Sequence, residues 1–134
     1  MRASAWKRLS PARPQNSSAS RRTLQDITAQ RALDAQIIGI RIEAGDVPEI
    51  EREVDHTVVF PRKAKAIAAA HELHAAGYRV ALNSSGVFQV TATASIDSDV
   101  AAETVDRTSL WMIDLAARHG GEYDGWGSAI ATHS

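Results

Sequence analysis

Residues 51–60, EREVDHTVVF, give the strongest indication of the fold, because apolar and polar side chains alternate over a full strand length. Side chains of an extended strand point alternately to its two faces. One face would then carry Val54, His56, Val58 and Phe60, and the other Glu51, Glu53, Asp55, Thr57 and Val59. The pattern predicts a half-buried strand whose outer face is acidic.

The segments that follow alternate between strand and helix patterns. Residues 78–82 predict a short strand, 83–86 a turn, 87–96 a second clear strand, and 121–128 an edge strand. Helical spacing separates them, first after Pro61 (Ile67, Ala70, Leu73 and His74, closed by Gly77) and later before Gly120 (Ala101, Val105, Met112 and Leu115). We therefore expect an α+β fold, the ferredoxin-like βαββαβ sandwich, in which two helices cover one face of a four-stranded antiparallel sheet.

The segment that precedes this unit, residues 23–44, admits two interpretations. Its apolar residues recur at helical spacing from Leu24 onward, and Thr23 and Asp26 resemble a capping box. Ile38, Ile40 and Ile42 also alternate as in a strand, beside Gly39, which is a poor helix residue. The longer period favours a helix to about residue 44, ended by Gly45.

The charge of the chain is divided between two parts. The 134 residues hold 15 Lys and Arg against 16 Asp and Glu, a formal net charge of −1. Six bases and no acid lie in residues 1–22, which leaves nine bases against 16 acids in residues 23–134. We interpret residues 1–22, rich in Ser, Arg and Pro, as a disordered basic extension that could fold back onto the acidic domain of residues 23–134.

Composition excludes several classes of protein. Because the chain has no cysteine, it has no disulfide framework, no thiolate metal site and no cysteine nucleophile. Its apolar runs are far shorter than the roughly 20 residues of a membrane span. Residues 1–22 have no apolar core of a secretory signal. We therefore expect a cytoplasmic protein without membrane contact.

The histidines are the candidate catalytic or metal-binding residues. His71 and His74 are three residues apart, whereas a zinc-protease helix places its histidines four apart, and no third ligand is evident. His56 lies on the expected core face, either as a general base or as a buried residue with a hydrogen-bond partner; the second interpretation is favoured. No metal or cofactor is predicted, and a small metal- or His-dependent hydrolase is the alternative function.

The expected outer face of the sheet favours a protein partner over RNA. Sheets of this kind bind RNA by stacking bases on aromatic side chains. This face carries Glu51, Glu53 and Asp55 and lacks aromatic residues, so it would repel phosphate. The same charge suits an Arg-rich peptide or a basic protein surface, and the three acids are candidate partner-binding residues.

The last strand contains the most unusual string, Glu122-Tyr123-Asp124-Gly125-Trp126-Gly127. Asp124-Gly125 allows a bulge that would turn Tyr123 and Trp126 to the same side, toward the domain. The aromatics would then close the core, or Trp126 would anchor a protein interface. Glu122, Asp124 and Trp126 are therefore further candidate contact residues.

This string resembles the terminal motif of the regulator of ribonuclease activity B (RraB) family, the ribonuclease E inhibitors. Gly45-Asp46-Val47-Pro48, residues 54–61 around Asp55-His56, and Ala75-Ala76-Gly77-Tyr78 resemble other parts of the family, so the resemblance covers about residues 36–128. The matching motif residues are His56, Phe60, Gly77, Tyr123, Asp124, Gly125, Trp126 and Gly127.

The resemblance implies a non-enzymatic, ferredoxin-like domain preceded by a helix that includes residues 37–42. It also implies a protein partner, a ribonuclease E-like endoribonuclease whose cleavage of RNA is damped by protein–protein contact, with no direct binding of nucleic acid. An acidic domain that docks on an Arg-rich segment fits this role electrostatically. A domain of this family with an unrelated partner is the remaining alternative.

Overall fold

The computed structural model describes residues 17–84, 86 and 89–133. Its elements follow one another as α2 (Ser17–Glu43), β1 (Arg52–Phe60), α3 (Lys63–Ala75), β2 (Arg79–Ser84), β3 (Val90–Ser98), α4 (Ala102–Arg118) and β4 (Glu122–Ser128). The protein is thus an α+β structure with four strands and three helices in the described residues, as predicted. None of these helices has both the length and the apolar character needed to cross a membrane.

The four strands form one antiparallel sheet in the order β2-β3-β1-β4. β1 lies inside the sheet, where Val54 pairs with Ile96 and Val58 pairs with Ala92 of β3. The alternation predicted for residues 51–60 is confirmed, since Val54, His56, Val58 and Phe60 are buried whereas Glu53 and Asp55 are exposed.

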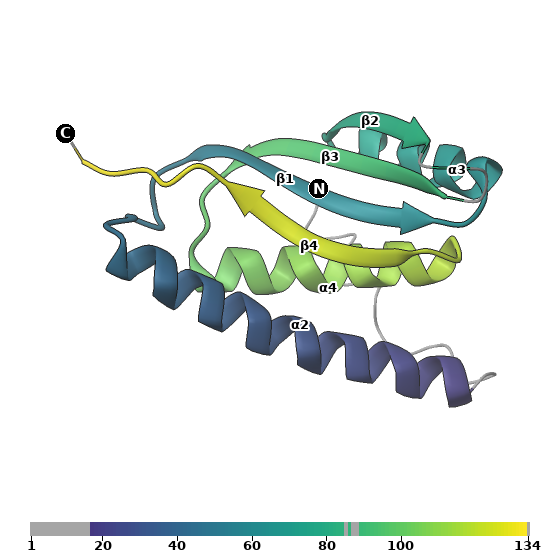
Figure 1. Cartoon of the computed structure of the whole chain (residues 1–134), viewed down its shortest axis with the longest axis horizontal. Coiled ribbons are helices and arrows are strands. Elements are labelled where there is room, and N and C mark those ends of the chain that lie inside the picture. The colour runs from purple at the N-terminus through teal and green to yellow at the C-terminus, as the bar shows by residue number, and fades with distance from the viewer. Residues whose placement is uncertain (1–16, 85, 87–88, 134) are drawn as a thin grey trace.

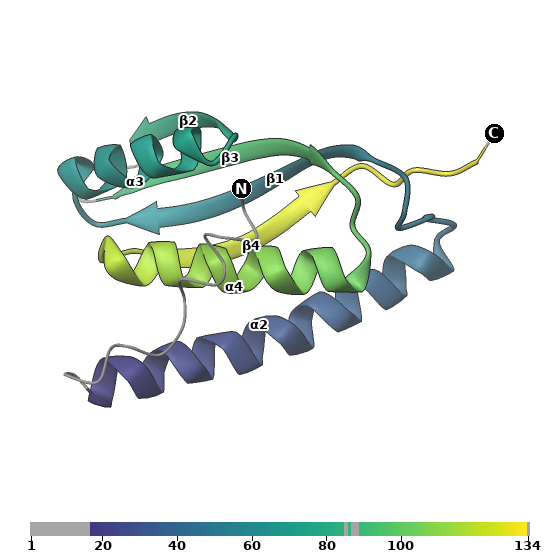
Figure 2. The same ribbon diagram turned by 180° about the vertical axis from the view of Figure 1, so that it is seen from behind.

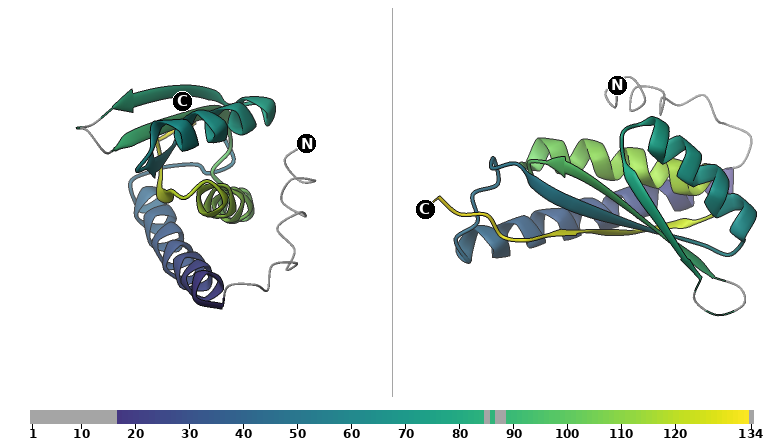
Figure 3. Two further views of the ribbon diagram at one scale, coloured as in Figure 1. Left: turned by 90° about the vertical axis from the view of Figure 1, so that its right-hand side faces the viewer. Right: turned by 90° about the horizontal axis from the view of Figure 1, so that it is seen from above.

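All three helices lie on one side of the sheet (Figures 1 and 2). α3 contacts β1, β2 and β3, and α4 contacts β1 and β4. α2 packs along α4 in the opposite direction, and the end-on view shows it below α4 and beside the β4 edge (Figure 3). The main core lies between the sheet and α3 and α4, around Phe60, Leu73, Trp111, Met112 and Leu115.

The buried stripe of α3 differs from the prediction. Leu73 is buried as expected, but Ala66 and Ala69 form the rest of the stripe, while Ile67 and His74 are exposed. Small side chains let a helix approach a sheet closely, because interiors are packed to high density. The predicted stripe therefore contained the larger Ile67, whereas the buried residue is the neighbouring Ala66.

α2 resolves the ambiguity between helix and strand in favour of the helix. The helix continues through residues 37–42 and ends at Glu43, and Gly45 follows with φ of +98°. The N–H of Asp46 donates to Arg41 O and the N–H of Gly45 donates to Ile42 O, the paired bonds of a Schellman end. The helix begins at Ser17 rather than at Thr23, so the predicted capping box does not start it. The prediction of disorder is therefore wrong for residues 17–22, which belong to α2. Residues 1–16 lie outside the described residues, and for them the basic extension stays a prediction.

Candidate functional site

The side of the sheet opposite the helices carries a group of exposed carboxylates. We define the acidic face as the outward-pointing, exposed side chains of Glu53, Asp55, Asp97, Glu122 and Asp124. Glu53 and Asp97 are partners across β1 and β3. Asp97 is not among the predicted contact residues, because the strand predicted over residues 87–96 stops before it, whereas β3 continues to Ser98. Glu51 is exposed and immediately precedes β1.

Part of the acidic face is hollowed between β1 and β4. A depression of about 560 Å³ is lined by Arg52, Glu53, Asp55, Thr57 and residues 124–129. It brings together the predicted residues Glu53, Asp55, Asp124 and Trp126, and leaves Glu51 and Glu122 outside its lining. Arg79 of β2 lies 2.8 Å from Glu53 and 3.5 Å from Asp97, so one end of the face is partly neutralised.

A bulge in β4 sets the direction of the two aromatic side chains. Trp126 pairs with His56 and Tyr123 pairs with Val58, so Asp124 and Gly125 together stand opposite Thr57. Gly125 has φ of +94°, a conformation that L side chains rarely adopt. The predicted bulge is confirmed, and both aromatics point to the helical side while Asp124 stays on the acidic face.

Asp34 of α2 joins the last strand to two helices. Its Oδ1 accepts hydrogen bonds of 2.8 Å from Trp126 Nε1 and from Gln30 Nε2, and its Oδ2 accepts one of 2.8 Å from Ser109 Oγ. Asp34 is 5% exposed, so these donors satisfy a carboxylate that would otherwise be costly to bury. The indole N–H of Trp126 therefore has a structural partner. Whether Trp126 also contacts a protein partner stays a prediction.

His56 forms a second buried polar contact beside this cluster. Its Nδ1 lies 2.8 Å from the hydroxyl of Tyr123, and its ring meets the Tyr78 ring edge-on with centroids 5.9 Å apart. Burial raises the pKa of Tyr123 well above its usual range; a hydrogen bond with Ser109 opposes the rise and the Asp34 carboxylate adds to it. The favoured interpretation of His56, a buried histidine with a hydrogen-bond partner, is confirmed.

Asp46 ties the turn after α2 to the segment after β4. Its Oδ1 accepts from Arg52 Nη1 and from the N–H of Ala131, and Arg41 Nε lies 3.5 Å from its Oδ2. Burial alone would raise the pKa of Asp46, but the hydrogen bonds from Ala131 and Arg52 and the charges of the two arginines lower it. Arg41 also donates to Ser128 and Ala129 and lies over the Trp126 ring, 5.5 Å from its centroid.

The other candidate histidines do not converge on a site. His71 and His74 are both exposed on α3. Among the residues that the structure describes, no group of three or more His, Asp or Glu side chains is arranged to hold a metal ion. The geometry therefore gives no support to a metal-dependent mechanism at these positions.

Comparison with known proteins adds a family to this geometry. The model of the family described as Regulator of ribonuclease activity B matches residues 31–128, which include the bulge, Asp34 and Asp46. The chain belongs to this family. It is 30% identical over 110 residues to the Regulator of ribonuclease activity B of Pseudoalteromonas translucida (strain TAC 125), an alignment that covers 73% of this chain and 93% of that protein.

The residues that carry the resemblance to the RraB family divide into two groups by location. Phe60 is fully buried in the core, and Gly77 ends α3, where the N–H of Tyr78 donates to Leu73 O. His56, Tyr123 and Trp126 face the helices, whereas Asp124 and Gly127 are exposed on the outer side of β4. The same strand thus holds the fold together on one side and presents the acidic face on the other.

Proposed function

We propose that this protein regulates a ribonuclease by binding it through the acidic face, as a non-enzymatic inhibitor of a ribonuclease E-like endoribonuclease. One observation carries the proposal: the helices contact the opposite side of the sheet and leave the exposed carboxylates of β1, β3 and β4 uncovered. Membership of the RraB family supplies the class of partner.

Charge gives the proposed surface its selectivity. Glu53, Asp55 and Asp124 line one depression, so a basic segment laid across β1 and β4 would meet several carboxylates at once. Complementary charges speed encounter and reject partners of like charge. RNA is a partner of like charge, so we infer that the protein acts on the enzyme and does not bind the nucleic acid directly.

The fold and location complete the proposal. We infer that βαββαβ with the strand order β2-β3-β1-β4 is the ferredoxin-like arrangement, here preceded by α2. We also assign the protein to the cytoplasm, where a regulator of RNA degradation would meet its enzyme. A hydrolase using His56 is less well supported, because that histidine is buried against Tyr123.

The test is inhibition of a purified ribonuclease E-like enzyme by the full chain and by Glu53→Lys with Asp55→Lys. Both side chains are exposed, so the double variant should fold normally, which circular dichroism and urea unfolding would check. Each reversed charge replaces an attraction by a repulsion, and we expect the inhibition constant to rise at least tenfold.

The matched control is Glu43→Lys with Glu103→Lys, which reverses two exposed carboxylates on α2 and α4. This control has the same net charge as the test variant, but its changes lie on the helical layer. Equal inhibition by the two variants and the natural chain would exclude the acidic face. Recovery of other proteins, and of no endoribonuclease, in pull-downs would instead favour an unrelated partner.

A further inference from the structure

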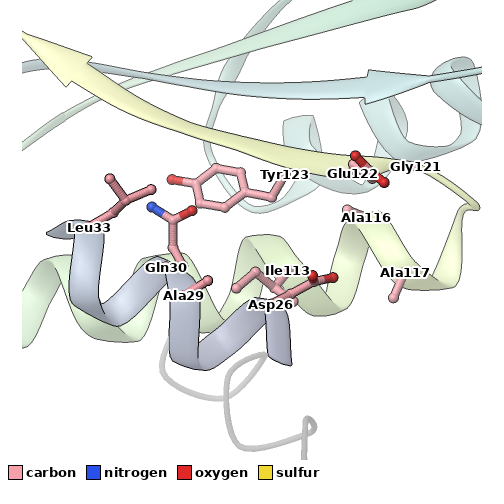
Figure 4. A pocket seen from close by; sticks show the side chains of 10 residues that line it. All are labelled: Asp26, Ala29, Gln30, Leu33, Ile113, Ala116, Ala117, Gly121, Glu122 and Tyr123. Atoms are coloured by element: carbon pink, nitrogen blue, oxygen red, sulfur yellow. The ribbon is translucent and has the colours of Figure 1, made fainter. Parts of the chain in front are cut away.

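A second hollow lies between α2, α4 and the start of β4 (Figure 4). Its volume is about 210 Å³, many times the roughly 15 Å³ that one bound water requires. Short side chains leave this space open, since Ala29, Ala116 and Ala117 are among the residues that line it. The pocket is thus open to a side chain of another molecule.

The pocket combines apolar walls with an aromatic surface. Leu33 of α2 and Ile113 of α4 line it, and the ring of Tyr123 extends into it from β4 (Figure 4). Leu33 is 49% exposed, so its side chain is accessible at the pocket. Such walls favour an aliphatic chain, and an aromatic ring can also receive a planar cation.

Two acidic residues line the same pocket: Asp26 of α2, and Glu122 at the β4 edge, whose side chain belongs to the outer side of the strand. Both are exposed, and within the described residues neither takes part in a hydrogen bond or an ion pair. Two other carboxylates of the helical layer are paired, Asp106 with Arg31 and Asp114 with Arg118. No Lys or Arg is among the residues that line the pocket, so its lining carries negative charge without a counter-charge.

We propose that this pocket receives an arginine side chain of the ribonuclease partner, an inference that rests on the proposed function. The aliphatic part of the arginine would lie against Leu33 and Ile113, with the guanidinium near Tyr123 and the two carboxylates. A guanidinium suits the Tyr123 ring because it is planar and always charged. It suits the carboxylates because its N–H groups donate in a fork that matches their two oxygens. A neutral or anionic side chain would leave Asp26 and Glu122 without a counter-charge.

The pocket is continuous with the acidic face through Glu122, which belongs to both. β4 is an edge strand of the sheet, so a partner segment can cross it without passing over another strand. A basic segment that lies on the acidic face would then reach over β4 and place one arginine in the pocket. This gives the interaction a defined anchor in addition to diffuse charge attraction.

The test uses N-acetyl-arginine amide as the probe in an NMR titration of the isotope-labelled full chain. We expect saturable chemical-shift changes at Tyr123, Ile113 and Ala117, and no such changes with N-acetyl-citrulline amide, which is nearly isosteric but uncharged. Asp26→Asn with Glu122→Gln should weaken binding by about fivefold or more, given the usual worth of exposed charge pairs.

A pair of alanine variants separates occupancy of the pocket from general surface effects. Ala29 and Ala32 are both exposed on α2, but only Ala29 lines the pocket. Ala29→Leu should fill the space and abolish the shifts, whereas Ala32→Leu should leave them unchanged, with similar unfolding curves for both. Equal binding by the two variants, or equal shifts with the citrulline probe, would overturn the proposal.

The two proposals fail in different ways. If the pocket binds the arginine probe while reversal of Glu53 and Asp55 leaves ribonuclease inhibition unchanged, the acidic-face function fails and the pocket stands as an arginine site. If that reversal abolishes inhibition while the probe causes no saturable shift, the pocket proposal alone is wrong.

Discussion

The indole Nε1 of Trp126 donates a 2.8 Å hydrogen bond to Oδ1 of Asp34, and this bond joins β4 to α2 across 92 positions of the chain. The same carboxylate accepts from Ser109 of α4, so one buried acid fixes three elements relative to one another. The family motif around Trp126 is thereby connected to a helix that the sheet itself does not contact closely.

Removal of this acid should destabilise the protein strongly. In Asp34→Ala the donors from Trp126, Ser109 and Gln30 lose their acceptor, and we expect a loss of about 2–4 kcal/mol in the free energy of unfolding. Urea unfolding at neutral pH measures it. Asp106→Ala is the control, since Asp106 also links α4 to α2, through Arg31, but is solvent-exposed. Its loss should stay below about 1 kcal/mol, and similar values for both variants would contradict the role given to Asp34.

Stability should fall in acid partly through Glu72. Glu72 of α3 is 2.6 Å from Arg118 and 3.0 Å from His119, and the hydrogen bond from Arg118 is the main cause that lowers its pKa from 4.5 to about 2. A pKa lowered in the folded state gives stability above the unfolded value, and that stability is lost as the pH falls from about 4.5 toward 2.

The measurement is the free energy of unfolding against pH for the natural chain and for Glu72→Gln. We expect the variant to lose up to about 1 kcal/mol at pH 7, because Glu72 remains a third exposed and solvent screens the pair. The difference should vanish near pH 2. Glu103→Gln, at an exposed site on α4, is the control and should keep the pH dependence of the natural chain.

A methyl group at Gly121 should disturb the junction between α4 and β4. A Cβ there would lie 2.6 Å from the ring of Phe60 and 2.6 Å from the carbonyl oxygen of Val59, so a buried ring and a strand backbone would have to move. Such overpacking typically costs about 1–3 kcal/mol. Gly127→Ala is the matched control, because its Cβ would meet no atom within 4 Å. A melting-temperature shift confined to Gly121→Ala is expected, and equal shifts would refute the close approach.

Binding to the ribonuclease should weaken as salt increases. The proposed contact places exposed carboxylates against a basic segment, and the Debye length shortens from about 10 Å at 0.1 M to about 3 Å at 1 M. Titration calorimetry at two salt concentrations should show a clear loss of affinity for the natural chain and a smaller one for Glu53→Lys with Asp55→Lys. An affinity independent of salt would point to an apolar interface instead.

Features that depend on neighbours along the chain could be predicted from the amino-acid sequence. The alternation of residues 51–60 predicted which side of β1 is buried and which is acidic, because side-chain direction in a strand has a period of two. Asp124-Gly125 predicted the bulge for an equally local reason, since glycine permits the positive φ that the bulge requires. The glycines after the helices likewise marked their ends.

Which distant residues meet depends on the packing of the folded chain. Asp34 looks like an ordinary polar residue of a helix, and its burial depends on the packing of α2 against α4 and on the contact with Trp126 of β4. Asp97 belongs to the acidic face because it pairs with Glu53 across β1 and β3. Ala66 is in the core because α3 packs against the sheet through small side chains. These contacts join elements far apart in sequence, and periodicity within one segment carries no information about them.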